Sequence, residues 1–200
     1  MFPVDFFFLG GRLAVDLLNT VVVPDGRVRD LLSRREDVAS WSEAAGVVSR
    51  RDLRNASHEP AELRAFRDAL RRGLVAWAAA GTPPARLIAM LNHHLARDPA
   101  VTEVSGKGRD VVTRVRSAGG PLDRLYGAVA RSAAELITRG DPHRLRKCAD
   151  PTCRAMFYDT SKSGRRRWCS MQMCGGRAKA RAFRRRVTKR SGPAPPAATS

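Results

Sequence analysis

The sequence predicts a mainly α-helical protein: a helical N-terminal domain that carries one β-hairpin, followed by a small C-terminal module of cysteine knuckles, short strands and a basic helix. Two observations predict this class. Apolar residues recur at the period of an α-helix through most of residues 1–142. All four cysteines of the 200-residue chain lie in residues 143–190, among many arginines. Residues 191–200 are rich in proline and alanine, so we expect a disordered tail there.

The clearest expected helix covers residues 60–80. Leu63, Phe66 and Leu70 begin an apolar stripe that continues to Trp77, and Gly81 ends the helix. Similar spacing and capping residues predict further helices over residues 33–45, 50–55 and 121–139.

The first expected helix follows a pair of glycines at residues 10 and 11. Leu13, Leu17 and Val21 recur at a spacing of four and predict that all three lie on one helix. Asp16 and Asn19 fall on its other side. One interpretation is a solvated face with a cap near the helix end; the other is that this pair lines a small-molecule pocket.

A helix is also expected after Thr82. This threonine can cap the helix, and Pro83-Pro84 would then occupy the first turn, where proline costs little. Its expected buried face consists of Leu87, Ile88, Leu91 and Leu95.

The expected hairpin lies between this helix and the last one of the N-terminal domain. Residues 101–104 and 111–115 alternate apolar and polar side chains around Ser-Gly-Lys-Gly. This turn lacks the spacing of a phosphate-binding loop and no helix follows it, so we expect a plain turn.

The net charge of the chain is +18, and its distribution is uneven. Residues 144–190 hold 16 Lys and Arg against two Asp, a charge of +14, whereas the rest carries +4. A cationic excess confined to one module predicts a polyanionic partner, nucleic acid first. The N-terminus has no basic region before its apolar residues, and no stretch is long enough to cross a membrane, so we expect a cytoplasmic protein.

The cysteines form two Cys-x4-Cys pairs, Cys148 with Cys153 and Cys169 with Cys174, separated by 15 residues. Two close pairs of thiolates can close a tetrahedral shell around zinc. In a reducing cytosol a metal site is favoured over two disulfides. We therefore expect one structural zinc ion held by these four residues.

Local signals around the cysteines predict the rest of the module. Asp150-Pro151 favours a turn in the first knuckle, residues 154–158 a short strand, and Ser170 the N-cap of a helix over residues 171–187. We expect Ala178, Ala182 and Phe183 to pack back onto the knuckles. The side chains expected to contact phosphates are Arg165, Arg166, Arg167, Arg177, Lys179, Arg181, Arg184 and Arg185.

These features predict a zinc-dependent protein that binds nucleic acid, with double-stranded DNA as the first partner and a small molecule as a candidate effector. An RNA-binding module is the first alternative, because Phe157, Tyr158 and Trp168 could stack unpaired bases. An enzyme that uses Asp16, Asn19 or His58 is the second, but no nucleophile and base motif supports it. We expect no enzymatic activity.

The cysteine module resembles the CGNR zinc finger family. The two Cys-x4-Cys pairs, Phe157-Tyr-Asp159-Thr-Ser161, Trp168-Cys-Ser170 and Cys174-Gly-Gly-Arg177 follow the order of the family's pattern. Gly176 stands where the family has asparagine, which removes the hydrogen bonds of that side chain and adds backbone freedom at the helix start.

The segment from Gly10 to Thr20 is similar to the start of the ABATE domain that commonly precedes this finger. Together the two resemblances cover nearly all of residues 6–188. They imply a stress-related transcription regulator, with the N-terminal domain as its sensor and the finger as its DNA-binding part.

Overall fold

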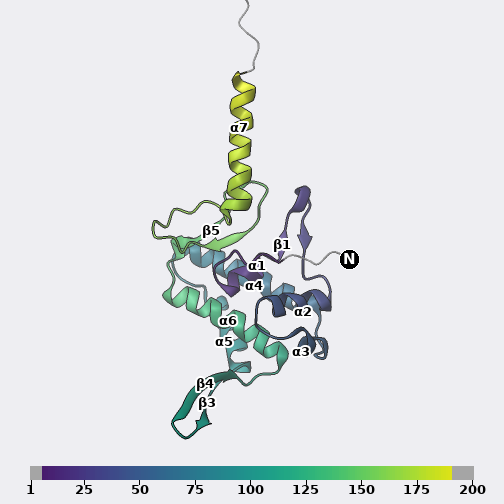
Figure 1. Cartoon of the computed structure of the whole chain (residues 1–200), viewed down its shortest axis with the longest axis vertical. Coiled ribbons are helices and arrows are strands. Elements are labelled where there is room, and N and C mark those ends of the chain that lie inside the picture. The colour runs from purple at the N-terminus through teal and green to yellow at the C-terminus, as the bar shows by residue number, and fades with distance from the viewer. Residues whose placement is uncertain (1–5, 191–200) are drawn as a thin grey trace, which may run out of the picture.

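The computed structural model describes residues 6–190 and confirms a mainly α-helical fold. In that part of the chain, seven α-helices accompany three two-stranded antiparallel sheets. A helical body lies in the middle of the molecule (Figure 1). One β-hairpin projects from one end, and the last helix projects from the other. The predicted tail and the first five residues lie outside the described residues.

The body is built around one short helix that is almost entirely buried. Helix α1 (Leu13–Leu18) packs against both α4 (Pro60–Ala80) and α6 (Pro121–Arg139), and α5 (Ala85–Arg97) packs on α6. Five of the six residues of α1 are buried, which places it in the centre of the apolar core. Helices α2 (Arg35–Ala44) and α3 (Arg50–Arg54) pack on each other beside it.

The strongest sequence patterns predicted the bounds of their helices correctly. Helix α4 has the predicted bounds, with Gly81 in the left-handed conformation (φ 76°) after its last turn. Helix α6 covers the predicted residues, and Ser49 caps α3 by accepting a hydrogen bond from the backbone N–H of Asp52 at 3.1 Å. These elements follow from local signals alone, so their prediction needed no knowledge of the fold.

Three details of the predicted helices were wrong. Val21 does not continue α1 but lies in strand β1 (Val21–Val22), which pairs with β2 (Arg29–Asp30) around a 3-10 turn, η1 (Pro24–Gly26). Thr82 does not cap α5, which begins at Ala85 with Pro84 in the N-cap position. Ile88 lies on the expected apolar stripe but is 41% exposed.

The predicted hairpin is confirmed as β3 (Ala100–Lys107) and β4 (Asp110–Ser117), but its strands are longer than predicted: Ser105, Gly106 and Lys107 belong to β3, and the turn consists of Gly108 and Arg109. The two strands pair throughout their length, from Ala100 opposite Ser117 to Lys107 opposite Asp110. Nearly all of its side chains are exposed, in agreement with its projection from the body in Figure 1.

The C-terminal module joins the body through strands β5 (Leu145–Lys147) and β6 (Met156–Tyr158), which follow a 3-10 turn, η2 (Pro142–Arg144). Side chains of both strands belong to the apolar core of the body: Leu145, Met156 and Tyr158. The predicted boundary at residue 142 therefore separates two sequence regions that share one core in space.

A π-helical turn, η3 (Met171–Gly175), and helix α7 (Gly176–Arg190) complete the described chain. None of the helices in residues 6–190 combines the length and apolar character needed to cross a bilayer.

Candidate metal centre and basic helix

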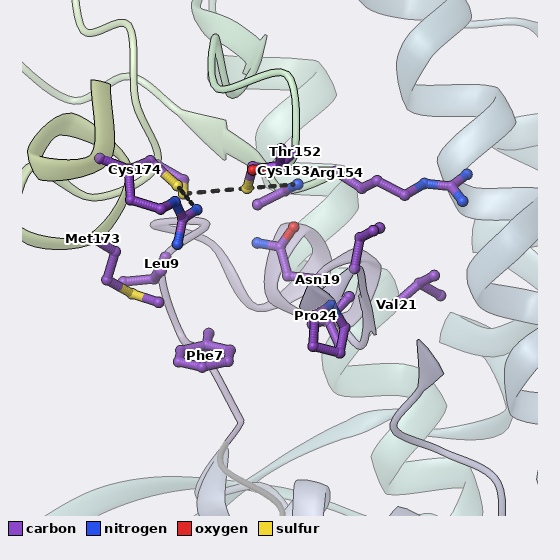
Figure 2. Close-up of a pocket in the computed structure, with 15 residues that line it drawn as sticks. Phe7, Leu9, Asn19, Val21, Pro24, Thr152, Cys153, Arg154, Met173 and Cys174 are labelled. Carbon is purple, nitrogen blue, oxygen red and sulfur yellow. Dashed lines mark hydrogen bonds between the residues drawn. The ribbon is translucent and has the colours of Figure 1, made fainter. Parts of the chain in front are cut away.

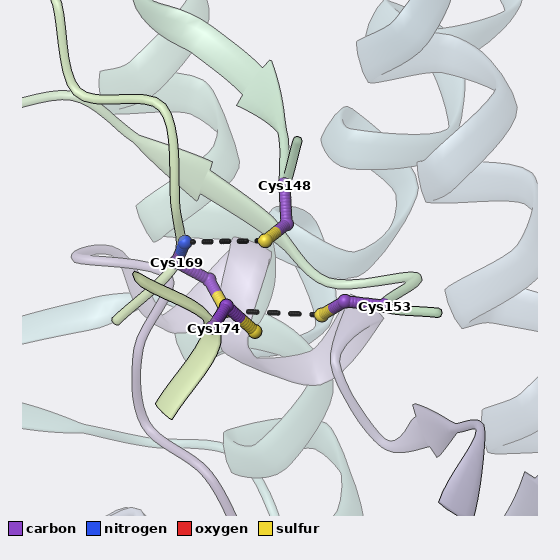
Figure 3. Close-up of side chains that lie close together, drawn as sticks. All are labelled: Cys148, Cys153, Cys169 and Cys174. Atoms are coloured by element: carbon purple, nitrogen blue, oxygen red, sulfur yellow. Dashed lines mark hydrogen bonds between the residues drawn. The ribbon is translucent and has the colours of Figure 1, made fainter. Parts of the chain in front are cut away.

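The four cysteines converge on one point between β5, β6 and η3 (Figure 3). Their sulfur atoms all lie within 4.8 Å of one another. The Sγ of Cys169 is 3.8 Å from that of Cys153 and 3.5 Å from that of Cys174. Zn–S bonds of about 2.3 Å at tetrahedral angles place sulfurs about 3.8 Å apart. The arrangement therefore fits a tetrahedral zinc site.

The first knuckle is shaped by the side chain of Asp150. Its Oδ1 accepts hydrogen bonds from the backbone N–H of Thr152 at 3.1 Å and from its hydroxyl at 2.8 Å. The backbone N–H of Cys153 donates to the carbonyl of Asp150 at 2.9 Å. These bonds fold the chain back between the strands, which brings the sulfurs of Cys148 and Cys153 together.

The second knuckle is shaped by Ser170. Its hydroxyl accepts a hydrogen bond from the N–H of Met173 at 3.2 Å, as predicted for an N-cap, and its carbonyl accepts from Cys174 and Gly175. The first turn is a π-helical turn, however, and the α-helix begins only at Gly176. Cys174 therefore lies in the wide first turn, directed back toward Cys169.

Hydrogen bonds reach three of the sulfurs from outside the metal position. The N–H of Ala155 donates to Cys153 at 3.4 Å, that of Cys169 to Cys148 at 3.5 Å, and the guanidinium of Arg177 to Cys174 at 2.9 Å. Four thiolates around one Zn²⁺ leave a net negative charge, and donors of this kind stabilise it.

Deprotonation of the four clustered cysteines requires a cation that neutralises their negative charge. Hydrogen bonding to Cys153 together with burial raises the pKa of Cys169, and burial raises that of Cys174 to about 12. Four clustered thiolates repel one another unless a metal neutralises them. The shell is complete with protein sulfurs, so the site fits one structural zinc ion and leaves no open coordination position.

The carboxylate of Asp150 also fixes helix α7 to the first knuckle. Its oxygens form ion pairs with Arg177 at 3.0 Å and Arg181 at 3.1 Å, and its side chain is fully buried. Although burial favours the neutral acid, the hydrogen bonds from Thr152, Arg177 and Arg181 hold the pKa of Asp150 well below its usual range. The ionised carboxylate thus sets the direction in which α7 leaves the zinc site. The local sequence around Asp150 predicts only the turn.

A second buried carboxylate organises the arginine-rich loop. Asp159 accepts hydrogen bonds from the N–H and hydroxyl of Ser161 and, at 2.8 Å, from the N–H of Arg166. The guanidinium of Arg166 lies over the ring of Phe157, 4.5 Å from its centre, and donates to the carbonyls of Trp168 and Cys169. Arg166 is therefore engaged inside the module.

The remaining predicted phosphate contacts lie in two places. Arg165 and Arg167 are exposed in the loop, and Arg167 lies 5.0 Å from the centre of the Trp168 ring. Lys179, Arg184 and Arg185 are exposed along α7. Three further predicted contacts form hydrogen bonds or ion pairs within the module: Arg166, Arg177 and Arg181.

The expected packing of α7 against the knuckles is wrong for two of its three residues. Ala182 and Phe183 are exposed, Phe183 to 66%, because the helix projects away from the body (Figure 1). Ala178, nearer the zinc site, is half-buried.

Asp16 and Asn19 are buried, so the interpretation as a solvated face was wrong. The Oδ1 of Asp16 accepts the N–H of Gly10 at 2.6 Å. The amide of Asn19 donates to the carbonyl of Met156 and accepts the N–H of the same residue, both at 2.9 Å. Asn19 thus pairs with strand β6 as a neighbouring strand would, and the carbonyl of Gly10 accepts the N–H of Tyr158 at 2.8 Å beside it.

Asn19 also lines a pocket of about 250 Å³ between the N-terminal segment and the zinc knuckles, whereas Asp16 does not (Figure 2). Phe7, Leu9 and Pro24 line it from the body, and Cys153 and Met173 from the module. Both polar atoms of the Asn19 side chain form hydrogen bonds with the backbone of Met156, so this residue primarily connects α1 of the body to β6 of the zinc module. Of the residues named for an enzyme, His58 is buried and its Nδ1 lies 3.0 Å from the carbonyl of Ala56.

Comparison with known protein families agrees with this geometry. The sequence model of the ABATE family, described as "Putative stress-induced transcription regulator", matches residues 11–140. That of the CGNR zinc finger matches residues 144–187, which contain all four cysteines. A comparison with curated proteins found no match. With the first match covering more than half of the chain and the second covering its metal centre, this protein belongs to the ABATE family and carries a CGNR zinc finger.

Proposed function

We propose that this zinc-binding protein is a transcriptional regulator that binds double-stranded DNA through α7 and the arginine-rich loop, with its N-terminal domain as the sensor. The observation that supports this most strongly is α7 itself. It leaves the zinc site, projects from the body and carries basic residues without a single acid in its sequence (Figure 1). We further propose that the protein has no enzymatic activity and acts in the cytoplasm, where thiols remain available to zinc.

The arrangement of charges along α7 supports insertion into a DNA groove. At 100° per residue, Arg177, Arg181, Arg184 and Arg185 fall on one face. The 15 residues of α7 span about 22 Å, and the major groove is about 12 Å wide, enough for an α-helix. Asp150 holds the first two arginines of this face at the module. Arg184 and Arg185 then extend the same face away from it.

The burial of two aromatic rings favours duplex DNA over unpaired RNA. Phe157 is fully buried and Tyr158 is 8% exposed, so neither offers a face on which a base could stack. Of the three aromatic residues that could stack unpaired bases, only Trp168 is then left, and the guanidinium of Arg167 lies over its ring. With two of the three proposed rings buried, Trp168 and the exposed Phe183 of α7 are the aromatic side chains left beside the basic helix, and the helix suits a phosphate-lined groove better than splayed bases.

The test is the affinity of the full chain for duplex DNA as a function of salt, with zinc content assayed, before and after chelation. About five phosphate contacts would give a log–log slope near −4.5. We expect the slope to be lost on chelation, because the module that orients α7 would unfold. Binding that survives chelation unchanged would contradict the proposal, since it would mark the arginines as an unstructured polycation.

Single substitutions sharpen this test. Arg165→Gln and Arg185→Gln should each weaken binding on every DNA sequence and reduce the slope by about 1. Arg109→Gln, in the exposed turn of the hairpin at the other end of the molecule, is the matched control and should leave the slope unchanged. Equal or tighter binding of structured RNA at the same salt concentration would replace DNA by RNA as the partner.

A further inference from the structure

A groove between helix α4 and the strands of the zinc module is lined by three cations. Arg71 comes from α4, Lys147 precedes the zinc ligand Cys148, and Arg154 follows the zinc ligand Cys153. The groove has a volume of about 420 Å³. Figure 2 shows the side chain of Arg154 directed away from the pocket drawn there and toward the helices of the body.

No carboxylate lines this groove, and the cations within it are poorly compensated. The guanidinium of Arg71 donates to the carbonyl of Leu18 at 2.5 Å, and burial followed by the nearby charges of Arg154 and Arg67 lowers its pKa. Among residues 6–190, the side chains of Lys147 and Arg154 have no ion-pair or hydrogen-bond partner. Like charges held this close in a partly buried groove repel one another, and an anion between them removes that cost.

The floor of the groove is apolar, which separates it from an ordinary phosphate-binding surface. It is formed by Val75, Ala78 and Ala79 of α4 together with Leu145 and Met156 of the module. Val75 is 47% exposed, whereas the larger apolar side chains of the same helix are buried: Leu63, Phe66, Leu70, Leu74 and Trp77. Apolar walls with a few convergent polar groups are typical of small-molecule sites, and this volume lies within their usual range.

We propose that this groove binds a small organic acid with an apolar body. Its carboxylate would lie among Arg71, Lys147 and Arg154, and its apolar part would cover Val75 and Ala78. The ligand would contact α4 on one side and both residues that flank the first knuckle on the other. Occupancy therefore ties the zinc module to the body, which gives the proposed sensing role a site and a ligand class.

The test uses octanoate as the probe, with octanol and octylammonium as uncharged and cationic analogues, titrated by calorimetry into the zinc-loaded full chain. We expect octanoate to bind with one site per chain, octanol more weakly and octylammonium not at all. Arg154→Gln and Lys147→Gln should each weaken octanoate binding by about tenfold, the loss expected for a hydrogen bond to a charged group. Octanol binding should be unaffected, and Arg109→Gln is the matched control.

Two further measurements locate the site and its effect. Val75→Ser should weaken both octanoate and octanol, whereas Ile88→Ser, at a similarly exposed position on α5, should weaken neither. At 100 times its dissociation constant, octanoate should lower the unfolded fraction of the protein about 100-fold and slow the transfer of zinc to a chelator accordingly.

Equal binding of the three analogues, or binding unchanged by Arg154→Gln and Lys147→Gln, would overturn the proposed site. Inorganic phosphate competing as well as octanoate would also overturn it and would assign the cations to a nucleic-acid backbone. Octanoate binding without any change in zinc transfer would overturn the coupling to the module. These titrations contain no DNA, so the absence of DNA binding would contradict the proposed function and leave this site standing.

Discussion

The helical body and the zinc module are held together by different forces. The body has a continuous apolar core, to which α1, α4 and α6 contribute fully buried side chains. The separate core of the module consists of one phenylalanine, Phe157, and three buried cysteines, with few partly buried residues around them. So little apolar surface cannot fold a module of this size, which must rely on metal ligation and on hydrogen bonds to buried carboxylates.

The largest expected effect comes from breaking the metal site. Cys169→Ser removes the thiolate that lies closest to two others, and structural zinc in finger peptides contributes an apparent 10–16 kcal/mol, about the whole stability of such a module. We expect the variant to lose zinc and the ordered signals of residues 148–190 in NMR spectra, while the helices of the body persist in circular dichroism.

Ser163→Ala, exposed in the loop between the two cysteine pairs, is the control and should retain zinc. Loss of the helices of the body in Cys169→Ser would contradict this expectation, because it would show that the body and the zinc module fold as one unit.

The second effect concerns the junction between the two regions. Asn19→Ala leaves the N–H and the carbonyl of Met156 without partners in a buried position, at a cost of about 2–4 kcal/mol. Because these groups belong to β6, beside the first knuckle, zinc should also be extracted faster by a chelator. Urea unfolding and chelation rates measure the two consequences.

Asn92→Ala, at an exposed position of α5, should change the stability by less than about 0.5 kcal/mol. If Asn19→Ala were equally silent, the pairing with β6 would not contribute to the attachment of the module.

The sequence predicted most reliably what is encoded locally. Helix α4 and the two Cys-x4-Cys knuckles depend on side chains a few residues apart, and both were located without the fold. The hydrogen bonds of Asn19 to strand β6 could not be predicted from the sequence, because the partner residue, Met156, lies 137 residues away. A buried amide near a helix end has the same local sequence signal as a solvated cap.

The prediction that certain apolar residues are buried failed for a related reason. Ile88 and Phe183 both occupy positions that helical periodicity assigns to a packed face, yet both are exposed. Periodicity shows which residues share a face, and only the arrangement of other elements decides whether something covers it. The turn at Asp150 could be predicted from the sequence. Its ion pairs with Arg177 and Arg181 could not, because they depend on α7 starting beside the first knuckle.

The third effect is a pH dependence in the body. Burial raises the pKa of Asp16 from its ordinary value to about 6, although the hydrogen bond from Gly10 opposes this. An acid whose pKa is raised on folding adds stability that is complete below its unfolded pKa, near 4, and is lost as the pH rises through about 6. At pH 7.5 the buried carboxylate therefore costs on the order of 2–3 kcal/mol.

Asp16→Asn keeps an acceptor for the N–H of Gly10 but cannot ionise. We expect it to be more stable than the natural protein at pH 7.5, with the difference shrinking as the pH falls through 6 to 5. Urea unfolding over this range measures it, and Asp110→Asn, in the exposed hairpin, serves as the control and should show no such trend. A difference that is constant with pH would mean that Asp16 does not titrate in this window.

The smallest effect tests the start of α7, where Gly176 replaces the asparagine of the family pattern. Gly176 has helical dihedral angles (φ −60°, ψ −47°), and an added Cβ would meet only the carbonyl oxygen of Met171 at 3.9 Å. At the preceding Gly175, a Cβ would lie 2.6 Å from the sulfur of Met171 and displace that side chain. Gly176→Ala should thus stabilise the module by about 0.5–1 kcal/mol, as expected for glycine to alanine in a helix.

Gly175→Ala should gain less, or lose stability, because Met171 must move. Thermal unfolding of the zinc-loaded proteins compares the two, and Gly176→Asn, which the same open space accommodates, tests the family residue directly. If the gain in Gly176→Ala were accompanied by tighter DNA binding at fixed salt, a loosely started α7 would be limiting the proposed contact with the groove. Stabilisation without a change in affinity would mean that Asp150, through Arg177 and Arg181, already orients the helix fully.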